Sequence, residues 1–140
     1  MIIKLDRKKR ELKAKSKSSH KDNHLKYVYV AAKAGEEKKG ENILLLDVSK
    51  LTTISDYFLI ITAKSIPQIE AIATCIEENL GELNYNLISR EGFVNSNWVV
   101  LDFGNLVVHI MNERERDYYK LERFWSNASL IDNKIWKKAS

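Results

Sequence analysis

Two strand-length runs joined by a two-residue turn decide the fold: Trp98-Val-Val-Leu-Asp-Phe103, then Gly104-Asn105, then Leu106-Val-Val-His-Ile-Met111. Two such runs around a turn pair of this kind are typical of a β-hairpin. A two-residue loop places Phe103 opposite Leu106, and side chains alternate between the two faces from there outward. The sequence therefore predicts the register of the hairpin as well as its presence.

The two faces of the predicted hairpin differ in composition. One face is entirely apolar and is predicted to be core: Val99, Leu101, Phe103, Leu106, Val108 and Ile110. The other mixes a tryptophan, an acid and an imidazole with aliphatic side chains: Trp98, Val100, Asp102, Val107, His109 and Met111. That mixture is more typical of a protein interface than of a sealed interior, so it is our candidate binding face. The alternative is that a helix covers it and that Asp102 and His109 satisfy each other across the strands.

The rest of the chain supplies helices and buried strands around the hairpin. Apolar residues at helical spacing predict helices over residues 25–39, 65–82 and 113–125. The second of these begins with a capping box, Ser65 followed by Gln68 three residues later. Apolar runs predict strands over 43–48 and 56–62, both covered on two faces, and a short strand is expected over 86–90. A chain of 140 residues with these elements fits one domain.

Charge divides the chain into a basic arm and a folded part. Residues 1–26 hold ten lysines and arginines against three acids, a net charge of +7, which leaves −3 for residues 27–140. The arm lacks hydrophobic periodicity, so we expect it to be flexible and able to neutralise phosphates; a solvated tail without a partner is the alternative. Its candidate phosphate contacts are Lys8, Lys9, Arg10 and Lys13. Residues 132–140 are expected to form a basic, weakly structured end.

The sequence also indicates in which cellular compartment the protein is expected. The single cysteine, Cys75, forms neither an internal disulfide nor a thiolate metal site alone, which favours a reducing compartment. No apolar run approaches the roughly 20 residues that span a bilayer, and the N-terminus lacks the apolar stretch of a secretory signal. We expect a cytoplasmic protein, with the interior of a plastid or another organelle as the alternative.

No catalytic motif is present. The chain contains no GxGxxG, GxxxxGK[ST], GxSxG or HExxH pattern and no cysteine pair. Asp47, Asp56 and Asp102 stand at apparent strand ends, but none forms the DxD pair that would hold two metal ions. We therefore expect no enzyme activity, no metal and no cofactor, with the acids serving turns and caps. The alternative is a nucleotide-binding or nucleotidyltransferase-type enzyme that uses these three acids.

The last predicted helix alternates charge sign along its length and carries aromatics on one side. Tyr118, Leu121 and Trp125 share that side, with Phe124 beside them. Aromatics next to arginine suit a partner surface, and they suit inward packing equally well. Both interpretations stay open on the residues alone.

Several motifs together resemble the ribosomal silencing factor family, also called Iojap-like or RsfS. They are LDVS, DYF, the Ser-x-x-Gln-x-x-Ala-Ile-Ala helix, the REG turn, W-V-x-L-D-[YF]-G and the tyrosine-rich LER-[LF]-W helix. The combination is highly specific and covers residues 27–126, which places a basic arm over 1–26 before this domain and a tail over 127–140 after it. The resemblance implies a single small α/β domain with a mixed β-sheet flanked by helices, similar to a nucleotidyltransferase fold without its catalytic residues.

The resemblance also implies a function and a set of contacts. Family members bind the large ribosomal subunit through its protein fourteen and sterically block joining of the small subunit, which represses translation. Carried onto this chain, the hairpin and the following helix supply the contacts: Trp98, Asp102, His109, Tyr118, Tyr119, Leu121 and Glu122. The basic arm is then placed to touch rRNA, and a homodimer is expected when the protein is free. With Trp98 at the interface, Trp98→Ala is expected to abolish binding and leave the fold intact.

Three positions depart from the family pattern. The usual Thr-Gly-Asn-Ser turn reads Thr62-Ala-Lys-Ser65, and Ile66-Pro67 precedes the glutamine. The usual Asp-[YF]-Gly-Asp ends in Asn105, which removes one acid near the implied contacts. If the partner is basic, the electrostatic contribution of that position is expected to be weaker.

Overall fold

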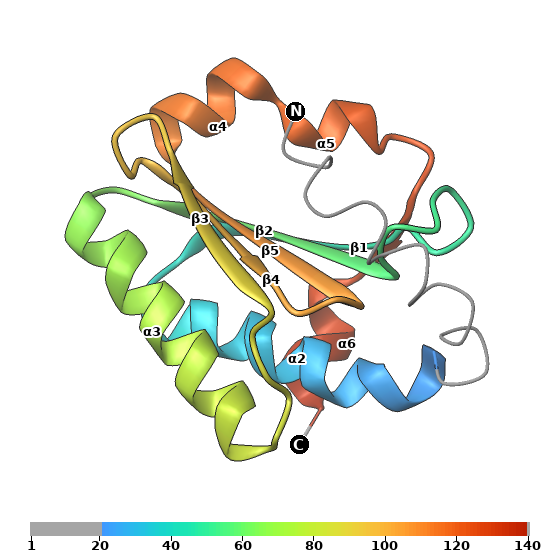
Figure 1. Ribbon diagram of the computed structural model, residues 1–140. Coiled ribbons are helices and arrows are strands. Elements are labelled where there is room, and N and C mark those ends of the chain that lie inside the picture. The colour runs from blue at the N-terminus through green and yellow to red at the C-terminus, as the bar shows by residue number, and fades with distance from the viewer. Residues whose placement is uncertain (1–20, 140) are drawn as a thin grey trace.

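A computed structural model describes residues 21–139, and it shows one six-stranded mixed sheet between two layers of helices (Figure 1). The strands are β1 Glu41–Asp47, β2 Tyr57–Ala63, β3 Ser89–Phe93, β4 Trp98–Asp102, β5 Leu106–Asn112 and β6 Ser129–Ile131. The helices are α2 Lys21–Glu37, α3 Ile66–Glu82, α4 Glu113–Tyr119, α5 Leu121–Phe124 and α6 Asn133–Lys138. The sheet order is β3-β4-β5-β2-β1-β6, in which β2 and β5 are parallel and the other neighbours antiparallel. The predicted fold class is confirmed.

The hairpin forms in the predicted register. Trp98 lies opposite Met111 and Asp102 opposite Val107, while the Phe103 amide donates to the Leu106 carbonyl at 2.8 Å. Gly104 takes a φ of 93°, the left-handed region that a tight turn needs and glycine adopts readily. The predicted apolar face is buried in the main hydrophobic core together with residues of α2 and α3. Local turn chemistry therefore fixes which hairpin side chains enter this core.

The start of α3 is capped as the sequence predicted. The Ser65 hydroxyl accepts from the Gln68 amide at 3.2 Å, and the Gln68 side chain accepts in return from the Lys64 amide at 2.7 Å. The same side chain donates to the carbonyls of Lys38 and Lys39 in the turn after α2. This glutamine thus caps one helix and ties it to the end of another.

The C-terminal segment belongs to the fold, so the expectation of a weakly structured end over 132–140 is wrong. β6 pairs with the second half of β1, and α6 lies with α2 and α3 on one side of the sheet (Figure 1). Trp136 of α6 is fully buried in the main core, where its indole N–H donates to Asn133 Oδ1 at 3.1 Å. Strand pairing through β6 and burial of Trp136 together attach this segment to the fold.

Other boundaries also differ from the prediction. α2 begins at Lys21, so the last residues assigned to the arm are helical; residues 1–20, which include Lys8, Lys9, Arg10 and Lys13, lie outside the described residues. β3 begins three residues later than expected. The predicted helix over 113–125 is broken at Lys120, whose backbone is left-handed with φ 47° and ψ 55°. The break turns α5 so that Leu121 and Trp125 pack toward the sheet.

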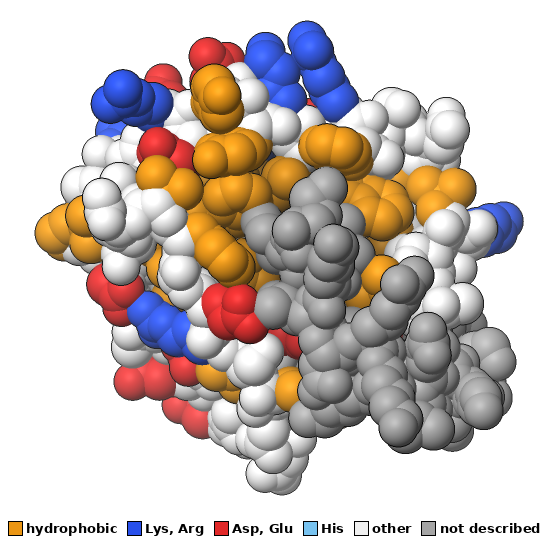
Figure 2. Space-filling view, turned by 45° about the horizontal axis from the view of Figure 1, so that its top comes forward, with side chains coloured by type: hydrophobic (Ala, Val, Ile, Leu, Met, Phe, Trp, Pro, Cys, Tyr) orange, Lys and Arg blue, Asp and Glu red, His pale blue; other side chains and the backbone are white. Residues whose placement is uncertain are grey.

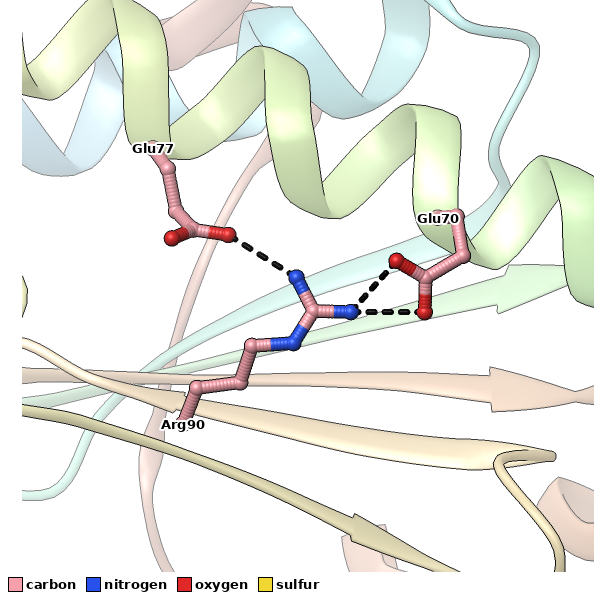
Figure 3. A network of polar contacts seen from close by, with 3 residues as sticks. All are labelled: Glu70, Glu77 and Arg90. Atoms are coloured by element: carbon pink, nitrogen blue, oxygen red, sulfur yellow. Dashed lines mark hydrogen bonds and ion pairs between the residues drawn. The ribbon is translucent and has the colours of Figure 1, made fainter.

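Strand β3, at the edge of the sheet, is joined to α3 by a polar network (Figure 3). Arg90 of β3 contacts both carboxylate oxygens of Glu70, at 2.5 and 2.6 Å, and reaches Glu77 at 3.1 Å. These side chains are between 28% and 47% exposed, and ion pairs near the surface contribute at most about 1 kcal/mol each. The network fixes the edge strand against the helix more than it stabilises the whole fold.

Candidate docking surface on helices α4 and α5

The second face of the hairpin is covered, as the alternative interpretation held. Trp98, Val100 and Met111 of this face lie in a second hydrophobic core, against which Leu121 and Trp125 pack. Trp98 is 5% exposed and His109 is 2% exposed. The strand face therefore offers a partner almost no direct contact area, and the expectation of an open binding face there is wrong.

Asp102 and His109 do not satisfy each other across the strands. The register sets Asp102 opposite Val107 and His109 opposite Val100, and Asp102 Oδ1 accepts from the Gly104 amide at 2.8 Å. Asp102 therefore stabilises the hairpin turn, through a hydrogen bond to a residue two positions away.

Trp98 and His109 form a buried hydrogen-bonded pair instead. The Trp98 indole N–H donates to His109 Nδ1 at 3.2 Å. Burial lowers the pKa of His109 to about 3, because no charged partner compensates the desolvation of an imidazolium. The ring is neutral near pH 7 and, since Nδ1 accepts, carries its proton on Nε2.

A row of aromatic rings leads from this pair to the surface. The Tyr119 ring lies 4.9 Å from Trp98, and the Tyr118 ring lies 5.0 Å from Tyr119, measured between centroids. Exposure rises along the row, from 5% at Trp98 through 41% at Tyr119 to 77% at Tyr118. Of the predicted contacts, the structure thus brings Trp98, Tyr119 and Tyr118 together as one row of rings in tilted and edge-to-face contact, with its outer end in solvent.

We define the α4–α5 surface as the aromatic and apolar side chains that these two helices and the residue after them present: Tyr118, Tyr119, Leu121, Phe124 and Trp125. Figure 2 brings this side of the molecule forward and shows hydrophobic side chains gathered there, with charged side chains at the margin. Phe124 is 62% exposed, whereas Leu121 and Trp125 are partly buried. Grouped exposed aromatics on a small protein are typical of binding surfaces, which makes the α4–α5 surface the candidate docking site.

The structure adds two residues to this region that sequence reasoning did not select. Phe124 was placed beside the predicted contacts, and its exposure follows from the break at Lys120. Arg116 belongs to α4, and only 11% of its side chain is exposed; burial lowers its pKa, although Glu122 opposes that effect. The predicted contact Glu122 lies 3.8 Å from Arg116. No sequence signal distinguishes Arg116 from the other charged residues of this helix.

Two of the three acids considered for catalysis make local hydrogen bonds. Asp47 accepts from the amide and hydroxyl of Ser49, at 3.0 and 2.6 Å, and Asp102 caps the hairpin turn. Within residues 21–139, no group of three or more His, Cys, Asp or Glu side chains is arranged to hold a metal ion. None of the helices in that range is both long and apolar enough to cross a membrane.

Comparisons with known proteins converge on one group. A sequence profile described as "Ribosomal silencing factor during starvation" matches residues 20–140. Ribosomal silencing factor RsfS of Bacillus subtilis is 38% identical over 110 residues, which cover 79% of this chain and 93% of that protein. The chloroplastic protein Iojap of Zea mays is 35% identical over 108 residues, which cover 77% of this chain and 47% of that longer protein. A crystal structure of a Chromobacterium violaceum protein superposes with a TM-score of 0.69 at 35% identity, over 71% of this chain and 83% of that one.

Proposed function

This chain belongs to the ribosomal silencing factor family, and on that premise we propose that it is a ribosome-associated repressor of translation. In the proposal it binds the large ribosomal subunit, through that subunit's protein fourteen, and sterically blocks joining of the small subunit. Such a factor needs one docking face and enough bulk to obstruct a partner. It makes and breaks no bond.

The observation that carries the proposal is the α4–α5 surface. Tyr118 and Phe124 are 77% and 62% exposed, which is unusual for aromatics unless a partner covers them. Tyrosine and other aromatics supply most of the binding energy at protein interfaces, because they bury a large area with few rotatable bonds. Docking through this surface would desolvate both rings.

Trp98 and His109 take a supporting role in this proposal. Their side chains lie under the surface, where Trp98 backs the Tyr119 ring and His109 accepts the Trp98 N–H. Asp102 does not contact these rings in the proposal; it stabilises the hairpin turn that follows β4. The predicted contacts thus separate into rings that touch the partner, Tyr118 and Tyr119 with Phe124 added, and residues that hold those rings.

Charge supports a basic protein as the partner. Residues 27–140 carry a net charge of −3, and ribosomal proteins are usually basic, so long-range attraction would favour the encounter. The +7 segment over 1–26 is then available for nearby rRNA. We further propose that the free protein forms a homodimer. Its location is that of its ribosomes, either the cytoplasm or the interior of an organelle.

Subunit joining tests the proposal. Purified large and small subunits are mixed with and without the protein at the Mg²⁺ concentration that supports association, and the products are separated on a sucrose gradient. We expect the joined-ribosome peak to shrink as protein is added and the protein to sediment with the large subunit. An unchanged profile at saturating protein would refute the blocking function.

A further inference from the structure

Helix α4, which carries part of the proposed docking surface, is short and contributes no buried residue to either core. It has seven residues, and none of them is buried. A helix of this length is not stable alone in water, so its position must come from specific contacts. Asn112 caps its first turn, where Asn112 Oδ1 accepts from the Arg114 amide at 3.0 Å. The far turn carries Tyr118 and Tyr119; the Tyr119 ring contacts Trp98, and the backbone of the turn needs a second anchor to the sheet.

Arg116 makes the contacts that tie this turn to the sheet. Its Nη1 donates to the Asn42 carbonyl at 2.6 Å and to Thr62 Oγ1 at 2.8 Å. Asn42 belongs to β1 and Thr62 to β2, so a single nitrogen joins α4 to two adjacent strands. The Arg116 carbonyl also accepts from the Lys120 amide at 3.0 Å, which closes the left-handed turn between α4 and α5.

An irregularity in β1 makes this arrangement possible. The pairing of β1 with β2 shifts between Glu41 and Leu44, so that Asn42 and Ile43 together lie opposite one residue of β2. Asn42 has a φ of 47°, in the left-handed region. A bulge of this kind takes a residue out of the regular ladder and re-aims its groups. Here the Asn42 carbonyl accepts the arginine.

The contacts of Arg116 are expected to contribute little to the free energy of unfolding. The side chain is 11% exposed, its two short hydrogen bonds go to neutral acceptors, and its Nε lies 3.8 Å from Glu122, beyond hydrogen-bonding distance. Burying a charge in this way offsets much of what the contacts contribute. Unlike an apolar side chain, the guanidinium makes directional hydrogen bonds, and these fix the orientation of α4 relative to the two strands.

We propose that Arg116 is a positioning residue for the docking surface: it orients α4 on strands β1 and β2, and thereby Tyr118 and Tyr119, without touching the partner itself. This inference rests on the proposed function of the α4–α5 surface. It predicts that buried Thr62, which no partner can reach at 1% exposure, affects ribosome binding.

The test uses Thr62→Val, which keeps the shape of the side chain and removes one acceptor, with Thr74→Val on the exposed face of α3 as the matched control. Binding of the full-length chain to purified large subunits is measured, together with the nuclear Overhauser contact between the Tyr119 ring and the Trp98 indole. We expect about a tenfold loss of affinity and a weaker Tyr119–Trp98 contact in Thr62→Val, and neither in the control. Arg116→Lys should act in the same direction, because the shorter lysine side chain does not bring its ammonium to the position of Arg116 Nη1, from which both acceptors are reached.

Unchanged affinity and an unchanged ring contact in both variants would overturn the inference. So would an affinity loss that only follows a general loss of folded protein, judged by the thermal unfolding of each variant. If the wild-type chain does not bind large subunits, the proposed function fails, and the ring contact alone then decides whether Arg116 orients α4.

Discussion

Replacing Trp98 by alanine tests the structural account of the second hairpin face. Trp98 is 5% exposed and is surrounded by Phe93, His109 and Tyr119. Removing a buried tryptophan lowers the free energy of unfolding by about 3 to 5 kcal/mol. Its loss also leaves His109 Nδ1 buried without the donor it now has, which adds about 1 kcal/mol or more. The sum approaches the whole stability of a small domain, about 5 to 15 kcal/mol.

Urea unfolding followed by circular dichroism measures this change, with Trp98→Phe as the companion variant. Phenylalanine keeps part of the ring contact, but it is smaller than tryptophan and lacks the indole N–H, so we expect it to lower the free energy of unfolding by about 2 to 3 kcal/mol. Trp98→Ala should lower it by about 4 to 6 kcal/mol. A loss below about 1 kcal/mol in Trp98→Ala would show that the ring is not core, and would restore the expectation of an intact fold with abolished binding.

Three further outcomes are expected from the other contacts. Burial holds the pKa of His109 near 3, whereas in the unfolded chain the imidazole binds its proton near pH 6.5. The free energy of unfolding should therefore fall by about 2 kcal/mol between pH 7 and pH 5. His109→Gln should flatten that pH dependence, and equal slopes in the wild type and the variant would contradict the lowered pKa of His109. Trp136→Ala should lower the free energy of unfolding by about 3 to 5 kcal/mol in urea melts, and a change near zero would mean that α6 is dispensable. Arg90→Met, which removes the network with Glu70 and Glu77, should change it by less than about 1 kcal/mol, and a larger loss would show that the edge strand depends on these ion pairs.

The elements that sequence reasoning predicted well are those that neighbouring residues determine. The hairpin register followed from Gly104-Asn105 and strict alternation, and the start of α3 followed from Ser65 and Gln68. Each depends on contacts a few residues apart. The strands β1 and β2 were visible for a related reason, since a continuous apolar run has few alternatives to burial.

The elements it missed depend on contacts between distant parts of the chain. Trp136 is buried on a helix whose Lys137 pairs with Glu36 at 3.0 Å, a hundred residues earlier. The left-handed backbone of Lys120 was not predictable from the sequence, because lysine is a good helix former. The break is explained by the packing of Leu121 and Trp125 on the second core. The binding-face prediction failed similarly: the composition of the face was read correctly, but nothing local showed that α5 would cover it.

The central claim, that the α4–α5 surface binds the large ribosomal subunit, is tested most directly by comparing two exposed side chains in one assay. Tyr118 is 77% exposed on α4, and Ile135 is 53% exposed on α6, on the other side of the sheet. Alanine at either position should change stability by no more than about 0.5 kcal/mol. In co-sedimentation with purified large subunits at moderate salt, we predict that Tyr118→Ala weakens binding by about 2 kcal/mol, roughly thirtyfold, whereas Ile135→Ala binds like the wild type. Equal binding by all three proteins, or equal losses in the two variants, would contradict the claim.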